Sequence, residues 1–188
     1  MTIPAFEAVW QRLEEATKGR SPFNFMQLAT LGMDGSPQVR TVVLRRSEPE
    51  GRLSFITDVR SPKIAEIAKD ARVALVGYDP ATSVQIRLTG IATRNTDEVE
   101  RQAVWEKLRG GTLALFGAAL APGTPLGERG MPLVREAEGG VAVDPYGHFA
   151  LIDFAVTHLD WLDLATTPHI RAAYYRDGST WIAQRLAP

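Results

Sequence analysis

The stretch QVRTVVLRR, residues 38–46, decides the fold. Its β-branched residues give it a strong preference for the extended conformation of a strand. Directly before it, residues 33–37 read MDGSP, which is the composition of a tight turn. The segment Phe23–Leu31, upstream of that turn, also has a strand-like pattern. These features together predict a hairpin that opens a β-rich fold.

The pattern of short strands continues along the chain. Residues 83–93 alternate apolar and polar side chains, which predicts a strand with one buried and one polar face. Further strands are predicted at 53–57, 73–78, 149–161, 170–176 and 180–184. Many short strands without a βαβ rhythm predict a mainly β fold, a small antiparallel barrel with flanking helices.

Three helices are predicted around these strands. Residues 3–18 place Phe6, Trp10 and Leu13 at helical spacing. A second helix opens at Ser61-Pro62, because serine suits the N-cap and proline the first helical position. A third is expected from an N-cap at Thr96 to about Leu108. Residues 110–147 are rich in glycine and proline and predict a long connection, a type of segment that is often functional.

The bulk composition narrows the class of protein. The chain has 188 residues, 45% of them hydrophobic, which predicts one domain over residues 1–188. A net charge of −1 gives no reason to expect a nucleic-acid or acidic-membrane partner. The absence of cysteine excludes disulfides and thiolate metal sites, and the three histidines are too scattered to suggest a metal site.

The chain also lacks the sequence features of export. Residues 1–7 have neither the basic stretch nor the apolar run of a signal peptide. The longest nearly apolar run, residues 113–121, is too short to span a bilayer. A cytoplasmic location without a membrane partner is therefore the expectation.

The sequence Arg60-Ser61-Pro62-Lys63 is the most suggestive local motif. A helix start offers unpaired backbone N–H groups and a partial positive charge, so it attracts a phosphate. Ser61 adds a hydroxyl donor, and Arg60 and Lys63 add positive charge. A capped surface helix with solvated cations is the alternative, and it is the better explanation of this motif taken alone.

Two other groups of polar residues are candidates for ligand binding. Arg40 and Arg45 are five residues apart, so an ideal strand directs them to opposite faces unless a bulge intervenes. Gln85 and Arg87 share a face, which is equally consistent with a solvated sheet surface.

The C-terminal strands carry a third group of candidates. Trp161, His169 and Arg171 supply an indole, an imidazole and a guanidinium, and the first and last can contact an aromatic ring system. Ordinary packing is the alternative for each. The chain contains no Walker loop, no GxGxxG after a strand and no GxSxG elbow.

Taken in order, these segments resemble the pyridoxamine 5'-phosphate oxidase family, in its branch of related FMN-binding proteins. The resemblance covers most of the chain and rests on an ordered series rather than one motif. The series is Leu28-Ala29-Thr30-Leu31 with the Asp34-Gly35 turn, Arg40-Thr41-Val42-Val43-Leu44-Arg45, Phe55-Ile56-Thr57, Ser61-Pro62-Lys63, Gln85 five residues before Gly90, Trp161, His169-Ile170-Arg171, and Trp181 followed by the ending Arg185-Leu186-Ala187-Pro188.

The resemblance implies a six-stranded antiparallel split β-barrel with flanking helices that forms a homodimer. FMN would lie at the interface between the subunits, with Trp161 and Arg171 reaching it from the partner chain. The implied cofactor-binding residues are Arg40, Thr41, Val42, Val43, Leu44, Arg45, Ile56, Thr57, Arg60, Ser61, Lys63, Gln85, Trp161 and Arg171. Of these, Thr57, Ser61 and Lys63 would hold the FMN phosphate.

Two departures from the family pattern lie on the cofactor side. The tyrosine position before Thr57 is Ile56, and the arginine position of the helix start is Pro62, where Arg60 is a candidate replacement. Neither change is expected to abolish FMN binding.

The substrate side departs further. The arginine expected two residues before His169 is Thr167. Among the positions expected to hold a substrate phosphate, Arg109 is retained, but the tyrosine position is Trp105 and the serine position is Leu113. These changes argue against oxidation of pyridoxamine phosphate itself.

The resemblance therefore predicts an FMN-dependent oxidoreductase acting on another small molecule. His169 would take the catalytic position, and Arg45, Arg109 and His169 would contact substrate. A non-catalytic module that stores, senses or carries FMN is the alternative. A third hypothesis is that the same fold binds a different cofactor, such as haem or a deazaflavin.

Overall fold

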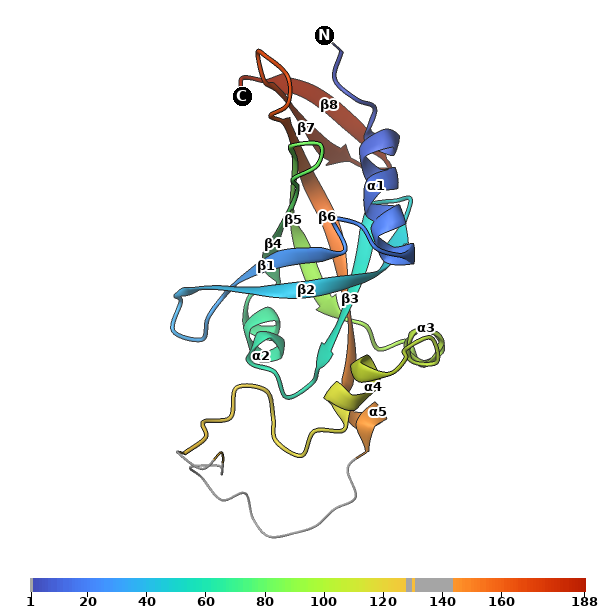
Figure 1. Cartoon of the computed structure of the whole chain (residues 1–188), viewed down its shortest axis with the longest axis vertical. Helices are drawn as coiled ribbons and strands as arrows, with labels where there is room; N and C mark the ends of the chain where they lie inside the picture. Colours follow the sequence, from blue (N-terminus) through green and yellow to red (C-terminus); the bar gives the residue numbers. More distant parts are fainter. Residues whose placement is uncertain (1, 128–129, 131–143) are drawn as a thin grey trace.

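The computed structural model describes residues 2–127, 130 and 144–188 (Figure 1). Its strands are β1 (Phe25–Leu31), β2 (Pro37–Glu48), β3 (Arg52–Asp58), β4 (Arg72–Asp79), β5 (Val84–Arg94), β6 (Phe149–Asp163), β7 (Ile170–Asp177) and β8 (Thr180–Leu186). Its helices are α1 (Phe6–Lys18), α2 (Pro62–Lys69), α3 (Glu98–Trp105), α4 (Gly111–Phe116) and α5 (Pro145–His148).

The strands form a closed antiparallel barrel. Neighbouring strands follow the order β3-β2-β1-β4-β5-β6, and β6 also pairs with β3, which closes a ring of six strands. Strands β7 and β8 extend the sheet from β6 beyond the ring. The expected six-stranded split barrel with flanking helices is therefore confirmed.

Every second side chain of the strands points inward and fills the barrel. In β5, Val84, Ile86 and Leu88 are buried, whereas Arg87 and Thr89 are exposed on the outer face. Antiparallel strands that bury one face give this pattern of period two. The polar residues available for ligand binding are therefore concentrated on the outside of the barrel and at its ends.

The N-terminal helix closes one end of the core. Phe6 of α1 stacks on Trp181 of β8, with ring centroids 4.3 Å apart. The Tyr174 hydroxyl of β7 donates a hydrogen bond of 2.7 Å to the Pro4 carbonyl. Both chain ends lie at this end of the molecule (Figure 1).

The third helix begins one residue later than predicted. Asp97, not Thr96, is the N-cap, and its carboxylate accepts a hydrogen bond of 3.0 Å from the Glu100 N–H. The Asn95 side chain accepts from the Asp97 N–H at 2.8 Å, which holds residue 96 in a turn before the helix. The helix also ends earlier than expected, at Trp105.

The predicted connection of residues 110–147 is described only in part. It contains the short helices α4 and α5, and residues 128–129 and 131–143 lie outside the described residues. Within the part of the chain that the structure describes, no helix has the length and apolar character needed to cross a membrane.

Candidate functional site

A cavity of about 660 Å³ lies between strands β2 and β3 and the segment that contains α4. Its volume is within the range typical of small-molecule sites. In Figure 1, α4 lies beside the lower end of β3. The lining residues are Asn24, Phe25, Thr41, Val42, Val43, Arg45, Ile56, Thr57, Asp58, Lys63, Thr112, Ala114, Leu115, Phe116, Ala118, Leu120 and Pro122.

Strand β2 directs alternate residues into this cavity. Thr41, Val43 and Arg45 line it, whereas Leu44 is fully buried in the barrel core. Val42 is also buried but reaches the lining. The pairing of β2 with β3 shifts between Leu44 and Arg46, so Arg45 is the extra residue of a bulge. Alternation along β2 places Arg45 on the cavity side with Thr41 and Val43, and the bulge changes the direction of the next residue, Arg46, which pairs with Ser54.

Arg45 lines the cavity and has no hydrogen-bond partner among the residues that the structure describes. Its Nε atom is buried and unpaired, and burial lowers the pKa of its guanidinium. A buried cationic donor that lacks a partner is costly unless a ligand supplies an acceptor. Arg45 is therefore suited to hold an electron-rich group in the cavity.

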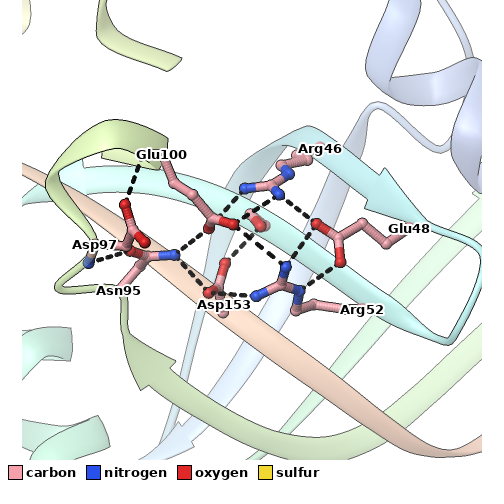
Figure 2. A network of polar contacts seen from close by, with 8 residues as sticks. Arg46, Glu48, Arg52, Asn95, Asp97, Glu100 and Asp153 are labelled. Atoms are coloured by element: carbon pink, nitrogen blue, oxygen red, sulfur yellow. Dashed lines mark hydrogen bonds and ion pairs between the residues drawn. The ribbon is translucent and has the colours of Figure 1, made fainter. Parts of the chain in front are cut away.

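Arg46, the next residue in β2, and Arg52 form a network of ion pairs with acidic side chains (Figure 2). Arg46 forms ion pairs with Glu48 at 2.5 Å and Glu100 at 2.8 Å. Arg52 forms ion pairs with Glu48 at 2.7 Å and with Asp153 at 3.3 Å. We call Arg46, Glu48, Arg52, Asn95, Glu100 and Asp153 the ion-pair cluster. The cluster joins β2, β3, β6 and the start of α3, and it does not include Arg45.

Lys63 lies at the cavity end where β3 meets α2. Its ammonium donates hydrogen bonds to the hydroxyls of Thr57 at 2.9 Å and Ser61 at 2.5 Å. Burial lowers the pKa of Lys63, and the nearby Arg40 lowers it further. Ser61 is the N-cap of α2 as predicted, but its hydroxyl makes no capping bond to the helix. An ammonium, two hydroxyls and a helix start fit a phosphate group.

Arg40 is turned away from the cavity. It forms an ion pair of 2.5 Å with the buried Glu66 of α2 and also donates to the Thr30 hydroxyl. Thr30 in turn donates to Glu66 at 2.5 Å. The opposite directions of Arg40 and Arg45 agree with their odd spacing in the strand. Arg40 affects the cavity because its positive charge lowers the pKa of the nearby Lys63.

Arg60 holds in place the segment after α4 that lines the cavity. Its guanidinium is bound by Asp58 at 2.7 Å and donates to the carbonyls of Ala118 at 2.9 Å and Ala119 at 3.1 Å. Burial alone would raise the pKa of Asp58, but the hydrogen bonds from Arg60 outweigh it and the pKa is lowered. Arg60 is thus committed to holding the segment that follows α4, and the prediction that it replaces the family arginine at Pro62 gains no support.

A separate outer face brings together Gln85 and Arg171. Both pair with Leu162 of β6, on its two sides, so the three residues form one row across β5, β6 and β7. In the next row, Asp160 accepts hydrogen bonds from Arg171 at 2.7 Å and from Arg87 at 2.9 Å. Gln85 and Arg171 are not among the residues that line the cavity.

The remaining C-terminal candidates lie apart from this row. Trp161 belongs to the opposite face, pairs with Ile86 and Ala172, and is buried in the barrel core. His169 is exposed, and its Nδ1 donates to the Thr166 carbonyl at 2.9 Å, which leaves Nε2 for another partner. Their predicted contacts with cofactor or substrate stay predictions.

The three positions expected to hold a substrate phosphate do not meet in the cavity. Trp105 packs edge-to-face against Phe116 at 5.5 Å and Phe149 at 5.3 Å, and Leu113 packs against the same cluster. Arg109 is exposed and donates to the carbonyls of Glu106 and Leu108. Trp105 and Leu113 therefore belong to an aromatic cluster with Phe116 and Phe149.

Comparison with known proteins identifies the family. Residues 5–95 match the family described as pyridoxamine 5'-phosphate oxidase, FMN-binding domain. The pyridoxine/pyridoxamine 5'-phosphate oxidase of Microcystis aeruginosa is 32% identical over 188 residues, which cover 95% of this chain and 86% of that protein. The chain belongs to the pyridoxamine 5'-phosphate oxidase family. The relative from Thermosynechococcus vestitus is 30% identical and covers 88% of this chain and 79% of that protein.

A solved structure agrees with this membership. The chain is similar to a pyridoxamine 5'-phosphate oxidase-related, FMN binding protein from Nostoc punctiforme, with 25% identity and a TM-score of 0.76 over 100% of both chains. Membership in the family indicates FMN as the cofactor. The residues around the cavity fit that cofactor, since Lys63, Thr57 and Ser61 suit its phosphate and the Arg45 guanidinium suits the hydrogen-bond acceptors of its ring.

Some residues of this region had no signal in the sequence alone. Glu66, Asp58 and Asp160 each bind an arginine of the candidate site, and all three are buried. An acidic residue in a helical or strand segment resembles any solvated residue until its neighbours are known. No group of His, Asp or Glu that could hold a metal was found among the described residues.

Proposed function

We propose that this chain is an FMN-dependent oxidoreductase of a small molecule. It would act as a homodimer in which residues 1–188 form a single FMN-binding domain. The single observation that carries the proposal is the buried Nε atom of Arg45, which has no hydrogen-bond partner among the described residues and belongs to a cavity that Lys63 also lines. Two cations in one cavity suit the two groups of hydrogen-bond acceptors in FMN, those of its phosphate and those of its ring.

The proposal gives each side chain a role. Lys63, Thr57 and Ser61 bind the phosphate, and the β2 face of Thr41, Val43 and Arg45 contacts the ring system. FMN supplies a hydride acceptor at its N5 atom when it is bound. Arg45 and His169 orient the substrate, with His169 in the catalytic position and its Nε2 free to hold a polar substrate atom.

A second copy of the chain would supply the other contacts. Gln85 and Arg171 share a row on the outer barrel surface, where Arg171 would meet FMN across the subunit interface. Strands β1, β2 and β5 also expose Leu31, Val39 and Ile91, with exposed fractions of 38%, 65% and 41%. Exposed apolar groups of this kind are typical of a protein–protein contact.

A non-catalytic FMN-binding module is the second candidate. The observation that favours it is the loss of the substrate positions, since Trp105 and Leu113 pack in the aromatic cluster and Arg109 folds back on its own backbone. Haem or a deazaflavin is disfavoured because the family assignment is to an FMN-binding domain.

The first experiment is the visible absorption spectrum of the purified protein. We expect a flavin spectrum, with FMN released on denaturation, and a dimer by sedimentation. A colourless chain that fails to take up added FMN would refute both candidates. Reduction of the bound flavin by a chemical reductant, followed by reoxidation with a panel of organic acceptors, separates the two, because a storage module shows no acceptor-dependent turnover.

A further inference from the structure

The far wall of the cavity is apolar. It is formed by α4 and the residues that follow it, namely Thr112, Ala114, Leu115, Phe116, Ala118, Leu120 and Pro122. One threonine hydroxyl is the only polar side-chain group in this set. A phosphate brought against such a wall would lose hydration without gaining hydrogen bonds.

The wall is held in place rather than free to turn. Arg60 donates to the carbonyls of Ala118 and Ala119 and is itself held by Asp58. Phe116 is buried and packs against Trp105 and Phe149. The apolar side chains are therefore fixed toward the cavity from both ends of the segment.

The charged groups of the cavity leave little for a second phosphate. Among the described residues that line it, the cations are Arg45 and Lys63. Lys63 lies with Thr57 and Ser61, where the proposed function puts the FMN phosphate. Asp58 also lines the cavity, but its carboxylate is ion-paired with Arg60 and offers no hydrogen-bond donor to another anion.

We propose that the substrate of this site is an uncharged, mainly apolar molecule and not a phosphate ester. The inference rests on the proposed function, since it assigns the remaining space of the FMN cavity to substrate. It accounts for the loss of the phosphate-holding positions as a change of substrate class. The aromatic cluster of Trp105 and Phe116 supports the apolar wall that replaced them.

The test uses two probes that differ only in a phosphate. Equilibrium dialysis of the FMN-loaded chain with 2-naphthol and with 2-naphthyl phosphate measures each affinity through the fluorescence of the probe. We expect 2-naphthol to bind at least about tenfold more tightly, because burial of an unpaired phosphate is unfavourable.

A variant locates the probe in the cavity. Leu115→Arg adds a cation to the wall at a side chain that is 69% exposed, so folding should tolerate it. We expect it to raise the affinity for 2-naphthyl phosphate about tenfold through a charge-assisted hydrogen bond. Val99→Arg is the matched control, since Val99 is 80% exposed on α3 and does not line the cavity.

Three results would overturn the inference. They are 2-naphthyl phosphate binding as tightly as 2-naphthol, absence of binding for both probes, and an equal gain for Leu115→Arg and Val99→Arg. Flavin content, measured separately after denaturation, keeps this failure distinct from failure of the proposed function. A flavin-loaded chain that prefers the phosphate ester refutes only the substrate class.

Discussion

Arg45 and Arg46 are neighbours in β2, yet Arg46 is held by two carboxylates while the Nε atom of Arg45 is buried and unpaired. The bulge between Leu44 and Arg46 explains this difference. It directs Arg46 into the ion-pair cluster and leaves Arg45 over the cavity. One arginine stabilises the fold, and its neighbour is available to a ligand.

The first prediction compares these two arginines. Arg45→Met should weaken FMN binding roughly tenfold or more, because it removes a charged hydrogen-bond donor worth about 1.5–3 kcal/mol. It should not lower the free energy of unfolding of the FMN-free chain, since it removes a buried charge without a partner. Arg46→Met should do the reverse and lower that free energy by about 1–2 kcal/mol.

Urea unfolding and FMN titration of both variants check this pair. Loss of stability in Arg45→Met with unchanged FMN affinity would contradict the ligand role of Arg45.

The second prediction concerns the pH dependence at Lys63. Burial lowers its pKa from 10.5 in the FMN-free chain, so the ammonium loses its proton at lower pH than an exposed lysine. A bound phosphate favours the charged form. The affinity for FMN should therefore be greatest at neutral pH and fall as pH rises through the lowered pKa of Lys63.

Titration of FMN binding at increasing pH tests this fall. Lys63→Gln should bind more weakly, by roughly tenfold, and lose the pH dependence. Lys69→Gln, at the other end of α2, is the matched control and should behave as the parent chain. Any ionisation of FMN itself is common to all three proteins, so a pH dependence in Lys63→Gln as large as that of the parent chain would remove Lys63 from the site.

The third prediction concerns acid stability. Hydrogen bonds from Arg46 and Asn95 lower the pKa of Glu100 from 4.5 to about 2. A lowered carboxyl pKa gives stability that is complete above pH 4.5 and is lost as pH falls toward about 2. Glu100→Gln should therefore cost about 1–2 kcal/mol at neutral pH, and the difference from the parent should shrink over that window.

Unfolding at a series of pH values measures the difference. Glu106 is exposed and lies outside the cluster, so Glu106→Gln should have almost the same unfolding free energy as the parent chain at every pH. If Glu100→Gln lowers the unfolding free energy by the same amount at every pH, the charge of Glu100 does not contribute to stability and only the shape of its side chain matters.

The fourth prediction concerns Asp160, which accepts from both Arg171 and Arg87. Burial alone would raise its pKa, but hydrogen bonds from the two arginines outweigh it and the pKa is lowered. Asp160→Asn should reduce the unfolding free energy by about 1–3 kcal/mol. If Arg171 reaches FMN from the partner, the loosened guanidinium should also weaken FMN binding.

FMN titration of Asp160→Asn under conditions where the dimer persists tests this second effect. Asp177→Asn, in the exposed β7–β8 hairpin, is the control. Unchanged FMN affinity alongside a loss of stability would limit Asp160 to a structural role.

Local chemistry was sufficient to predict much of the fold. The turn at residues 33–37 and the β-branched run after it predicted the hairpin, and β1 pairs with β2 as expected. Residue parity predicted that Arg40 and Arg45 point to opposite faces. Helix α1 was found because its apolar spacing is a property of the helix alone. The N-cap of α3 was missed by one residue because Thr96 and Asp97 are both good caps, and the choice depends on Asn95.

The parts of the site that depend on tertiary structure were beyond sequence reasoning. The ion pair of Arg40 with Glu66 exists because α2 packs beneath β1, which no local pattern specifies. The bulge at Arg45 reflects the register between β2 and β3. Arg60 was a candidate phosphate ligand because of its position beside Ser61 and Lys63, but its contacts with Asp58 and with the residues after α4 could not be read from the sequence.

Closure of the barrel has a consequence for how this chain can fold. The five strands β1 to β5 lie within residues 5–95, but the strand that joins β3 to β5 is β6, which begins at Phe149. Until β6 arrives, both of those strands present open hydrogen-bonding edges, which are prone to pair with other chains. The last step of assembly is therefore a contact between distant parts of the sequence, a slow kind of step in protein folding. During synthesis, the first half of this protein should depend on chaperones or on prompt completion of the chain to escape aggregation.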